Sequence, residues 1–307
     1  MQNQLAIVNQ NFNSVEATNK FISFLDVSPL TVRAYKSGLK IFFEYLSFTG
    51  IKNPDKNDIV SFKKELEAKG RKPSTIALYL SALRRFFQWT ETEGIYQNIT
   101  TGIKTPKLNK GHKKDYFAGY QIKSILSGID RSNIEGLRNY AVMALMTACG
   151  LRTVEITRAN IEDLSTMGGV PVLYVQGKGR TDKADFVKIP QQVENAIREY
   201  FKARGEIHTN EPLFTSLSKR NSGSKLTTRT ISSIAKSAMI NAGFNSDRLT
   251  AHSLRHTAVT LALLGGQSLS DVQAFARHTN INTTMIYNHA VSRINSQCEN
   301  LIANSIF

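Results

Sequence analysis

The feature that most constrains the fold is a helical pattern that occurs twice in the first third of the chain. Residues 29–43 and 73–87 align at an offset of 44 positions, and seven of the fifteen residues are identical. Each copy opens with a proline, which is favoured at the first position of a helix, and its apolar residues recur every three to four positions. Two copies are too few for a solenoid. The repeat therefore predicts two equivalent long helices in a compact bundle, with a shorter helix over residues 55–70 between them.

The charge of the chain indicates a polyanionic partner. The 307 residues include 39 Lys and Arg against 24 Asp and Glu, a net charge of +15. Residues 1–114 alone hold 18 basic residues against 9 acidic ones. Such a field attracts nucleic acid. A membrane surface is the competing interpretation, but no basic amphipathic segment stands out, and solubility alone explains a smaller excess.

A basic segment containing Pro and Gly, KTPKLNKGHKK at residues 104–114, predicts a linker. We therefore expect a helical N-terminal domain over residues 1–103 and a second domain over residues 115–307. The two cysteines are far apart and in no C-x-x-C pattern, so they predict reduced thiols. The first residues have neither a basic segment nor a long apolar one, which favours a cytoplasmic protein over an exported one.

The second domain is predicted to be mostly helical with one small antiparallel sheet. The β-rich segments VPVLYV (170–175) and ADFVKI (184–189) flank QGKGRTDK, a pattern typical of a hairpin with a Gly-rich, basic tip. Helical periodicity dominates on both sides of this hairpin. The fold class is therefore mainly α.

Basic and aromatic side chains recur at the ends of the expected elements of this second domain. They are Arg152, Lys178, His252, Arg255, His278 and, nine residues further on, Tyr287. One guanidinium group can bind two phosphate oxygens at once through two parallel hydrogen bonds. A tyrosine with an ordinary pKa near 10 becomes a nucleophile only beside a proton acceptor or cations. The set predicts attack of a tyrosine oxygen on a phosphodiester. Taken singly, Tyr287 is more typical of a core aromatic at a helix end, and AHSLRHT (251–257) fits a surface turn equally well.

The segments GLRTVEI, GKG, HSLRHT, ARH and INTTMIY, in this order, resemble the tyrosine recombinase family, which includes phage-type integrases and Xer-like resolvases. The repeated N-terminal helices resemble the core-binding domain of that family. The resemblance implies a DNA-binding domain followed by a catalytic domain with a C-terminal tail helix. It also implies a site-specific DNA recombinase that works without metal, ATP or another cofactor.

The resemblance assigns a role to each site residue. Tyr287 is the nucleophile that forms a 3′-phosphotyrosine, and Arg152 and Arg255 hold the scissile phosphate. Glu155 orients the first arginine. His252 assists proton transfer from the tyrosine, and His278 hydrogen-bonds a phosphate oxygen.

Lys178 is expected to protonate the leaving 5′-oxygen, because the flanking glycines allow a close approach. Arg180 and Lys183 lie at the same hairpin tip, so the spacing leaves the choice among these cations open. His256 and His289 are expected to be structural.

The expected partner is double-stranded DNA with inverted half-sites, bound by four subunits. The candidate DNA-binding residues are Lys40, Arg84, Lys110, Lys113, Lys114 and Arg180, each of which reads equally as part of a solvated face. An apolar stripe in the tail, formed by Ile294, Cys298, Leu301 and Ile302 with Phe307 beyond it, is expected to join subunits or to pack on its own domain. Whether an accessory protein sets the direction of recombination stays open.

Three function classes remain. The first is a recombinase that integrates or excises a mobile element or resolves joined DNA, encoded by a bacterium or a phage and associated with the nucleoid. The second is a nicking and resealing enzyme like the type IB topoisomerases, which relaxes supercoils without pairing two sites. The third is a DNA-binding protein of the same fold without activity, which the complete residue set disfavours.

Overall fold

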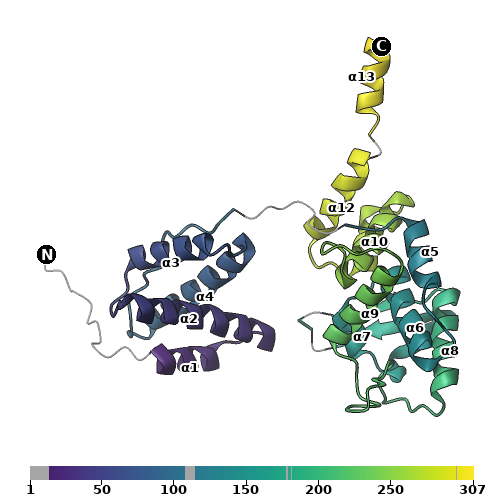
Figure 1. Cartoon of the computed structure of the whole chain (residues 1–307), viewed down its shortest axis with the longest axis horizontal. Helices are drawn as coiled ribbons and strands as arrows, with labels where there is room; N and C mark the ends of the chain where they lie inside the picture. The colour runs from purple at the N-terminus through teal and green to yellow at the C-terminus, as the bar shows by residue number, and fades with distance from the viewer. Residues whose placement is uncertain (1–13, 108–114, 178, 181, 295) are drawn as a thin grey trace, which may run out of the picture. The chain divides into compact units, whose positions relative to one another are not determined.

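A computed structural model describes residues 14–107, 115–177, 179–180, 182–294 and 296–307. These residues form two compact units, and the division falls between residues 110 and 111 (Figure 1). The described chain is mainly α-helical with one three-stranded antiparallel sheet, which confirms the predicted fold class.

The described residues of the first unit, 14–107, form four helices, α1 (Ser14–Phe24), α2 (Pro29–Thr49), α3 (Lys56–Ala68) and α4 (Pro73–Thr92). Helix α2 begins as predicted, because the Ser28 side chain accepts a hydrogen bond from the backbone N–H of Thr31 and Pro29 occupies the first turn. Helix α3 begins at an acidic capping box formed by Asp55 and Asp58.

Helices α2 and α4, the two copies of the repeat, pack against each other at equivalent positions. A Cβ atom placed on Gly38 would lie 3.3 Å from the Cβ of Ala82, its counterpart in the other copy. Four and five residues further along each helix, the phenylalanine pairs contact each other crosswise, Phe42 with Phe87 and Phe43 with Phe86. The duplicated sequence therefore builds a bundle core with an approximate two-fold relation between its long helices.

The second unit contains a small sheet and nine α-helices among its described residues. The strands are β1 (Leu164–Met167), β2 (Val170–Val175) and β3 (Asp185–Lys188), in the order β1-β2-β3. Strands β2 and β3 form the predicted hairpin, with Leu173 opposite Val187. The helices are α5 (Gly119–Ser127), α6 (Ile134–Ala148), α7 (Thr153–Arg158), α8 (Gln191–Arg204), α9 (Thr228–Asn241), α10 (Ala251–Leu264), α11 (Leu269–Ala276), α12 (Ile281–Ile294) and α13 (Cys298–Ile306), with a 3-10 turn at Ile161–Asp163.

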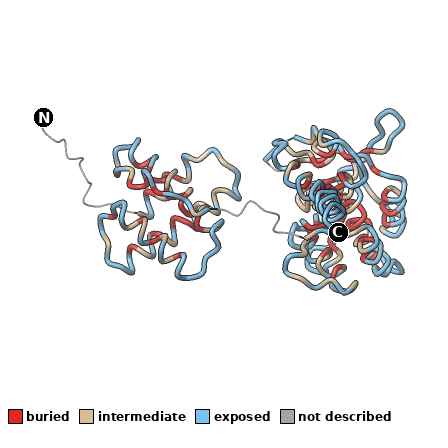
Figure 2. Tube along the Cα trace, turned by 90° about the horizontal axis from the view of Figure 1, so that it is seen from above, coloured by how far each residue is buried: buried red, intermediate tan, exposed pale blue. Residues whose placement is uncertain are grey.

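Two apolar clusters organise the second unit. The larger one surrounds α6, which packs against α8 and α10. The smaller one joins α10, α11 and α12, and contains Val259, Val272 and Tyr287. Buried segments lie inside each of the two units (Figure 2). Among the described residues, no helix is both long enough and apolar enough to cross a membrane.

Candidate active site

Arg152 stands at the start of α7, directly after a tight turn that ends α6. Gly150 makes this turn with φ +60°, and a Cβ atom there would lie 3.0 Å from the Phe275 ring. The backbone N–H and the guanidinium of Arg152 both donate to the Glu155 carboxylate, at 2.8 and 2.7 Å. Glu155 is completely buried. The carboxylate therefore holds Arg152 at both ends, in agreement with the orienting role that we expect for it.

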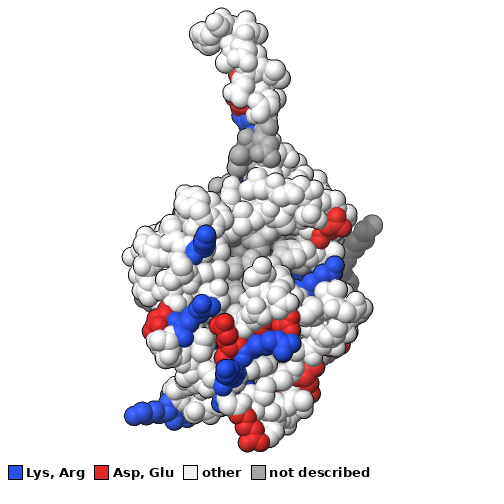
Figure 3. Space-filling model, turned by 90° about the vertical axis from the view of Figure 1, so that its right-hand side faces the viewer, with Lys and Arg blue, Asp and Glu red and all other residues white. Residues whose placement is uncertain are grey.

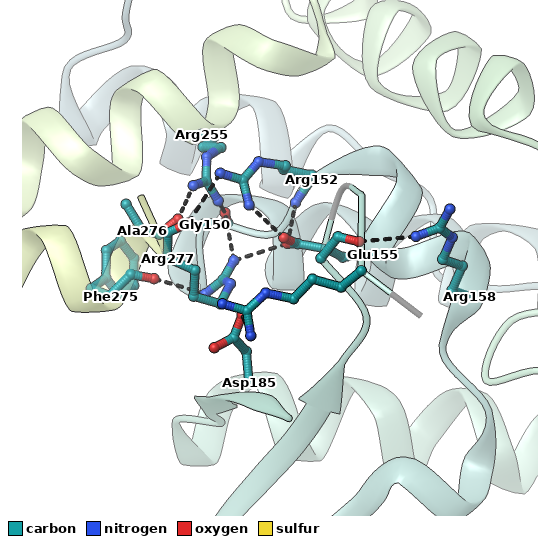
Figure 4. Close-up of polar contacts among 11 residues, drawn as sticks. Gly150, Arg152, Glu155, Arg158, Asp185, Arg255, Phe275, Ala276 and Arg277 are labelled. Atoms are coloured by element: carbon teal, nitrogen blue, oxygen red, sulfur yellow. Dashed lines mark hydrogen bonds and ion pairs between the residues drawn. The ribbon is translucent and has the colours of Figure 1, made fainter. Parts of the chain in front are cut away.

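Arg255 lies on α10 with 1% of its surface exposed. Its guanidinium donates to the backbone carbonyl of Gly150 at 2.5 Å and to that of Ala276. Burial, followed by the like charges of Arg152 and Arg277, lowers its pKa to about 9, so it stays charged at neutral pH. Figure 4 shows the guanidinium groups of Arg152, Arg255 and Arg277 gathered around Glu155 and the Gly150 carbonyl.

A surface pocket opens beside these arginines. Arg152, Arg255 and His252 line it together with Thr153 and Lys236. Cationic and hydroxyl groups on the wall of one hollow make a site for an anion such as a phosphate.

Tyr287 lies on α12 with 5% of its surface exposed, inside the smaller apolar cluster. Its hydroxyl hydrogen-bonds Nδ1 of His256. Burial raises the pKa of this phenol to about 12, although Arg255 and Arg152 act to lower it. At neutral pH the tyrosine therefore keeps its proton unless a base takes it.

The rings of the three histidines of the site, His252, His256 and His278, lie close to one another or to the ring of this tyrosine. The ring of His252 lies 4.3 Å from that of His256, and the His256 ring lies 5.0 Å from that of Tyr287. The His278 ring is stacked against that of Tyr287, with 6.3 Å between the ring centroids.

His278 is held by a buried hydroxyl. Its Nδ1 hydrogen-bonds Oγ1 of Thr284 at 2.9 Å, and Thr284 is completely buried. Burial, followed by the positive charges of Arg255, Arg152 and Arg277, lowers the pKa of His278 to about 4. The imidazole is therefore neutral at pH 7, and Nε2 is the nitrogen left to face a ligand.

The hairpin tip is described in part, and Lys178 lies outside the described residues. The two alternative cations each have a carboxylate partner. Lys183 donates to both oxygens of Asp163, at 2.8 and 2.6 Å, and Arg180 lies 3.5 Å from Asp185.

The remaining DNA-binding candidates differ in their surroundings. Lys40 is exposed on α2 and lies 3.7 Å from Glu44. Arg84 is half-buried on α4 and donates to the carbonyl of Ile103 at 2.6 Å. This hydrogen bond attaches the segment after α4 to the helix. Lys110, Lys113 and Lys114 lie outside the described residues.

Three residues of the site were not found from the sequence. His256, expected to be structural, hydrogen-bonds the tyrosine hydroxyl. Its distance of four positions from His252 on a helix was a signal that both share one face. Arg277 and Thr284 gave no comparable signal. Within the described residues, no group of three or more His, Cys, Asp or Glu can hold a metal ion.

Comparisons with known proteins agree with this geometry. The description "Phage integrase family" matches residues 116–293, and "Phage integrase, N-terminal SAM-like domain" matches residues 19–94. The tyrosine recombinase XerD of Listeria monocytogenes serotype 4b (strain F2365) is 29% identical over 283 residues, covering 88% of this chain and 92% of that protein. The tyrosine recombinase XerC of Caldanaerobacter subterraneus subsp. tengcongensis is 30% identical over 196 residues. That match covers 64% of this chain but spans only about half, 52%, of the relative.

Two solved structures have the same fold. One is XerH site-specific recombinase bound to palindromic difH substrate in a post-cleavage complex, with a TM-score of 0.74 and 22% identity over 95% of this chain and 85% of that one. The other is a lambda integrase (75–356) dimer bound to a COC′ core site, with a TM-score of 0.68 and 17% identity over 88% of this chain and 96% of that one.

The fold and these relatives define the class: tyrosine-type site-specific recombinases. The chain belongs to the phage integrase family, whose description matches more than half of its residues.

Proposed function

We propose that this protein is a site-specific DNA recombinase that cleaves and rejoins DNA strands through a covalent 3′-phosphotyrosine intermediate. The observation that carries the proposal is the arrangement around Tyr287. Its hydroxyl has a proton acceptor, His256, and the charges of Arg152 and Arg255 act on the same oxygen. A tyrosine with these neighbours has what it needs to attack a phosphodiester.

In the proposed cleavage step, the Tyr287 oxygen attacks the scissile phosphorus while its proton passes to Nδ1 of His256. His252, in ring contact with His256, assists this transfer. Arg152 and Arg255 bind the non-bridging phosphate oxygens from the pocket that they line. The loss of either arginine would raise the barrier by roughly 3–4 kcal/mol, by analogy with the removal of one preorganised donor.

The bond to the 5′-oxygen then breaks, and the leaving oxygen takes a proton from Lys178. We prefer this lysine because Lys183 and Arg180 are each paired with a carboxylate. His278, neutral at pH 7, hydrogen-bonds a phosphate oxygen through Nε2. The phosphotyrosine conserves the diester, so a 5′-hydroxyl from another strand reverses the step without ATP or a metal ion.

We further propose that four subunits act on two double-stranded sites with inverted half-sites, and that α13 joins neighbouring subunits. Among its described residues, α13 has no buried side chain, and Leu301, Ile302 and Phe307 are all more than half exposed. Beyond its start, the helix projects as an uncharged surface in Figure 3. An apolar helix face whose described side chains are all left exposed favours docking on a neighbour over packing in place, the alternative that the sequence left open. The side chain of Ile294, the first residue of the predicted stripe, lies outside the described part.

Similar structures support this assembly by analogy. One lambda integrase structure, with 16% identity and a TM-score of 0.67, is a tetramer bound to a Holliday junction. Deletion of residues 296–307 is expected to abolish tetramer formation on DNA, measured by analytical ultracentrifugation, while single-site binding persists. An unchanged tetramer would contradict docking between subunits.

The central experiment identifies the DNA target and tests the chemistry together. The protein is incubated with fragmented genomic DNA, denatured, and the covalently linked DNA is isolated and sequenced. Wild type should capture recurrent fragments that share inverted half-sites. Tyr287→Phe should capture none, while the matched control Tyr120→Phe, at an exposed tyrosine on α5, should behave as wild type.

Equal capture by wild type and Tyr287→Phe would refute the nucleophile. DNA binding without any covalent capture would favour the inactive DNA-binding alternative. Relaxation of a supercoiled plasmid that carries a single site would favour the topoisomerase-like alternative.

A further inference from the structure

Arg277 adopts a backbone conformation that side-chain-bearing residues seldom take. It ends α11 with φ 51° and ψ 48°, in the left-handed region, and is the one non-glycine residue with positive φ in the described parts of the chain. Glycine is usual at such a helix end because it has no Cβ. An arginine kept here must therefore be held by its surroundings, and such outliers gather at functional sites.

The side chain of Arg277 is buried among the site residues. It is 5% exposed and donates to Glu155 Oε2 at 2.9 Å. It also donates to the carbonyls of Phe275 and Gly150, at 2.7 and 3.3 Å. Its Nε is buried without a hydrogen-bond partner among the described residues. The Gly150 carbonyl is shared with Arg255 (Figure 4).

The backbone at this turn serves the same two arginines. The Ala276 carbonyl accepts from Arg255, and the carbonyl of Arg277 itself accepts from Arg152 at 3.4 Å. The left-handed turn thus aims two consecutive carbonyls at the two guanidinium groups that face the pocket. Arg277 is linked to Arg152 through its own carbonyl and to Arg255 through the shared Gly150 carbonyl, and its side chain donates to Glu155, the carboxylate that holds Arg152.

The net charge of this cluster balances the charge of the transition state in the proposed reaction. Arg152, Arg255 and Arg277 carry three positive charges and Glu155 one negative charge, which leaves two positive charges. A phosphodiester carries one negative charge. When a tyrosine oxygen adds to it and gives up its proton, the five-coordinate phosphorus group carries two. Without Arg277, the net charge of the cluster would balance the charge of the bound phosphodiester. With Arg277, it balances the charge of the transition state.

We propose that Arg277 is a positioning residue that holds Glu155 and supplies the second net positive charge, so that the cluster favours the transition state over the bound substrate. The proposal rests on the proposed function. It follows the rule that only interactions stronger in the transition state than in the ground state accelerate the chemical step. Arg277 exerts this effect without contacting DNA: its terminal nitrogens donate to Glu155 and to backbone carbonyls, and its Nε is buried.

The test uses the DNA site recovered by covalent capture, with either a normal phosphate or an uncharged methylphosphonate at the scissile position. The methylphosphonate lowers the charge of the transition state by one. Single-turnover formation of the covalent complex is measured for wild type, Arg277→Gly and Arg277→Lys. Glycine tolerates the left-handed turn, so this variant removes the side chain and keeps the backbone. Arg198→Ala on α8 removes an exposed positive charge as the matched control.

We expect Arg277→Gly to cleave the normal phosphate about 10- to 100-fold more slowly than wild type, with DNA affinity changed less than about two-fold. On the methylphosphonate the loss should shrink to a few-fold. Arg277→Lys should recover most of the rate on the normal phosphate. Arg198→Ala should cleave each of the two substrates at the rate of wild type.

Several outcomes would overturn the proposal. They are an equal rate for Arg277→Gly and wild type, an equal loss on both substrates, as a purely structural role predicts, and failure of both variants to fold. Failure of wild type itself to form a covalent complex would instead refute the proposed function.

Discussion

Replacement of Glu155 by glutamine should destabilise the second unit strongly although the two side chains have the same shape. The carboxylate is completely buried and accepts three hydrogen bonds, two from Arg152 and one from Arg277. Glutamine retains one acceptor oxygen, and its amide nitrogen would face an N–H donor. The change leaves three guanidinium groups close together without a counter-charge. Breaking a buried ion pair in this way costs about 3–5 kcal/mol.

The measurement is the free energy of unfolding from urea titration, supported by calorimetry. For a unit of this size the same loss lowers Tm by roughly 6–20 °C. Glu199→Gln is the matched control, because Glu199 is half-exposed and lies 3.5 Å from Arg131 on the surface. That exposed pair should contribute only about 0–1 kcal/mol.

The pH dependence of Glu155→Gln gives a second, independent check. Burial acts to raise the pKa of Glu155, but Arg277, the Arg152 backbone N–H, Arg152 and Arg255 together hold it below its usual value. A carboxyl with a lowered folded pKa stabilises the protein above its unfolded pKa of about 4.3, and this contribution is lost as the pH falls further. The gap between wild type and Glu155→Gln should therefore be full at pH 7 and narrow below about pH 4.3. A gap under about 1 kcal/mol at pH 7, or one that is constant down to pH 3, would refute the reasoning.

Three further predictions follow from single contacts. Thr284→Val removes the partner of His278 Nδ1 and should lower the free energy of unfolding by about 1–3 kcal/mol in urea titration, whereas Thr284→Ser should retain most of it. The His278 ring, with its pKa of about 4, should not titrate by NMR between pH 6 and 8, and its contribution to stability should be lost as the pH falls from about 6.5 to 4; a midpoint near 6.5 would contradict this. Leu39→Ala in the fully buried core of α2 should lower the free energy of unfolding of the first unit by about 2–5 kcal/mol and leave the calorimetric transition of the second unit unchanged.

The helices and the hairpin were predictable because their apolar residues repeat with the period of the element. The start of α2 was predictable as well, since Ser28 and Pro29 act locally. Strand β1, Leu164–Met167, was not predicted. Its four residues are mostly exposed and show no alternation of apolar and polar residues, and they form a strand only because β2 lies beside them.

Several members of the candidate site could be predicted from the order of the motifs along the chain. Motif order identifies Arg152, Arg255 and Tyr287, but it does not say which side chains meet. Whether His252 or His256 reaches the tyrosine hydroxyl depends on how α10 packs against α12, and both histidines satisfy the same spacing along α10. Arg277 could not be found by periodicity, because its place in the site depends on a left-handed turn after α11 and on contacts with Gly150 and Glu155, which are distant in the sequence.

Under the proposed function, folding and phosphate binding are expected to be coupled at this site. Arg152, Arg255, Arg277 and Glu155 together carry a net positive charge, and burial, followed by the like charges of Arg152 and Arg277, lowers the pKa of Arg255 to about 9. A phosphate in the adjoining pocket would offset part of this excess, so the proposed ligand is expected to stabilise the folded site. A ligand that binds only the folded state adds stability as its concentration exceeds Kd, by about 2.7 kcal/mol at one hundred times Kd. The repulsion that weakens the unliganded site is therefore also the source of its preference for a phosphate, and a variant with a neutral cluster would lose both together.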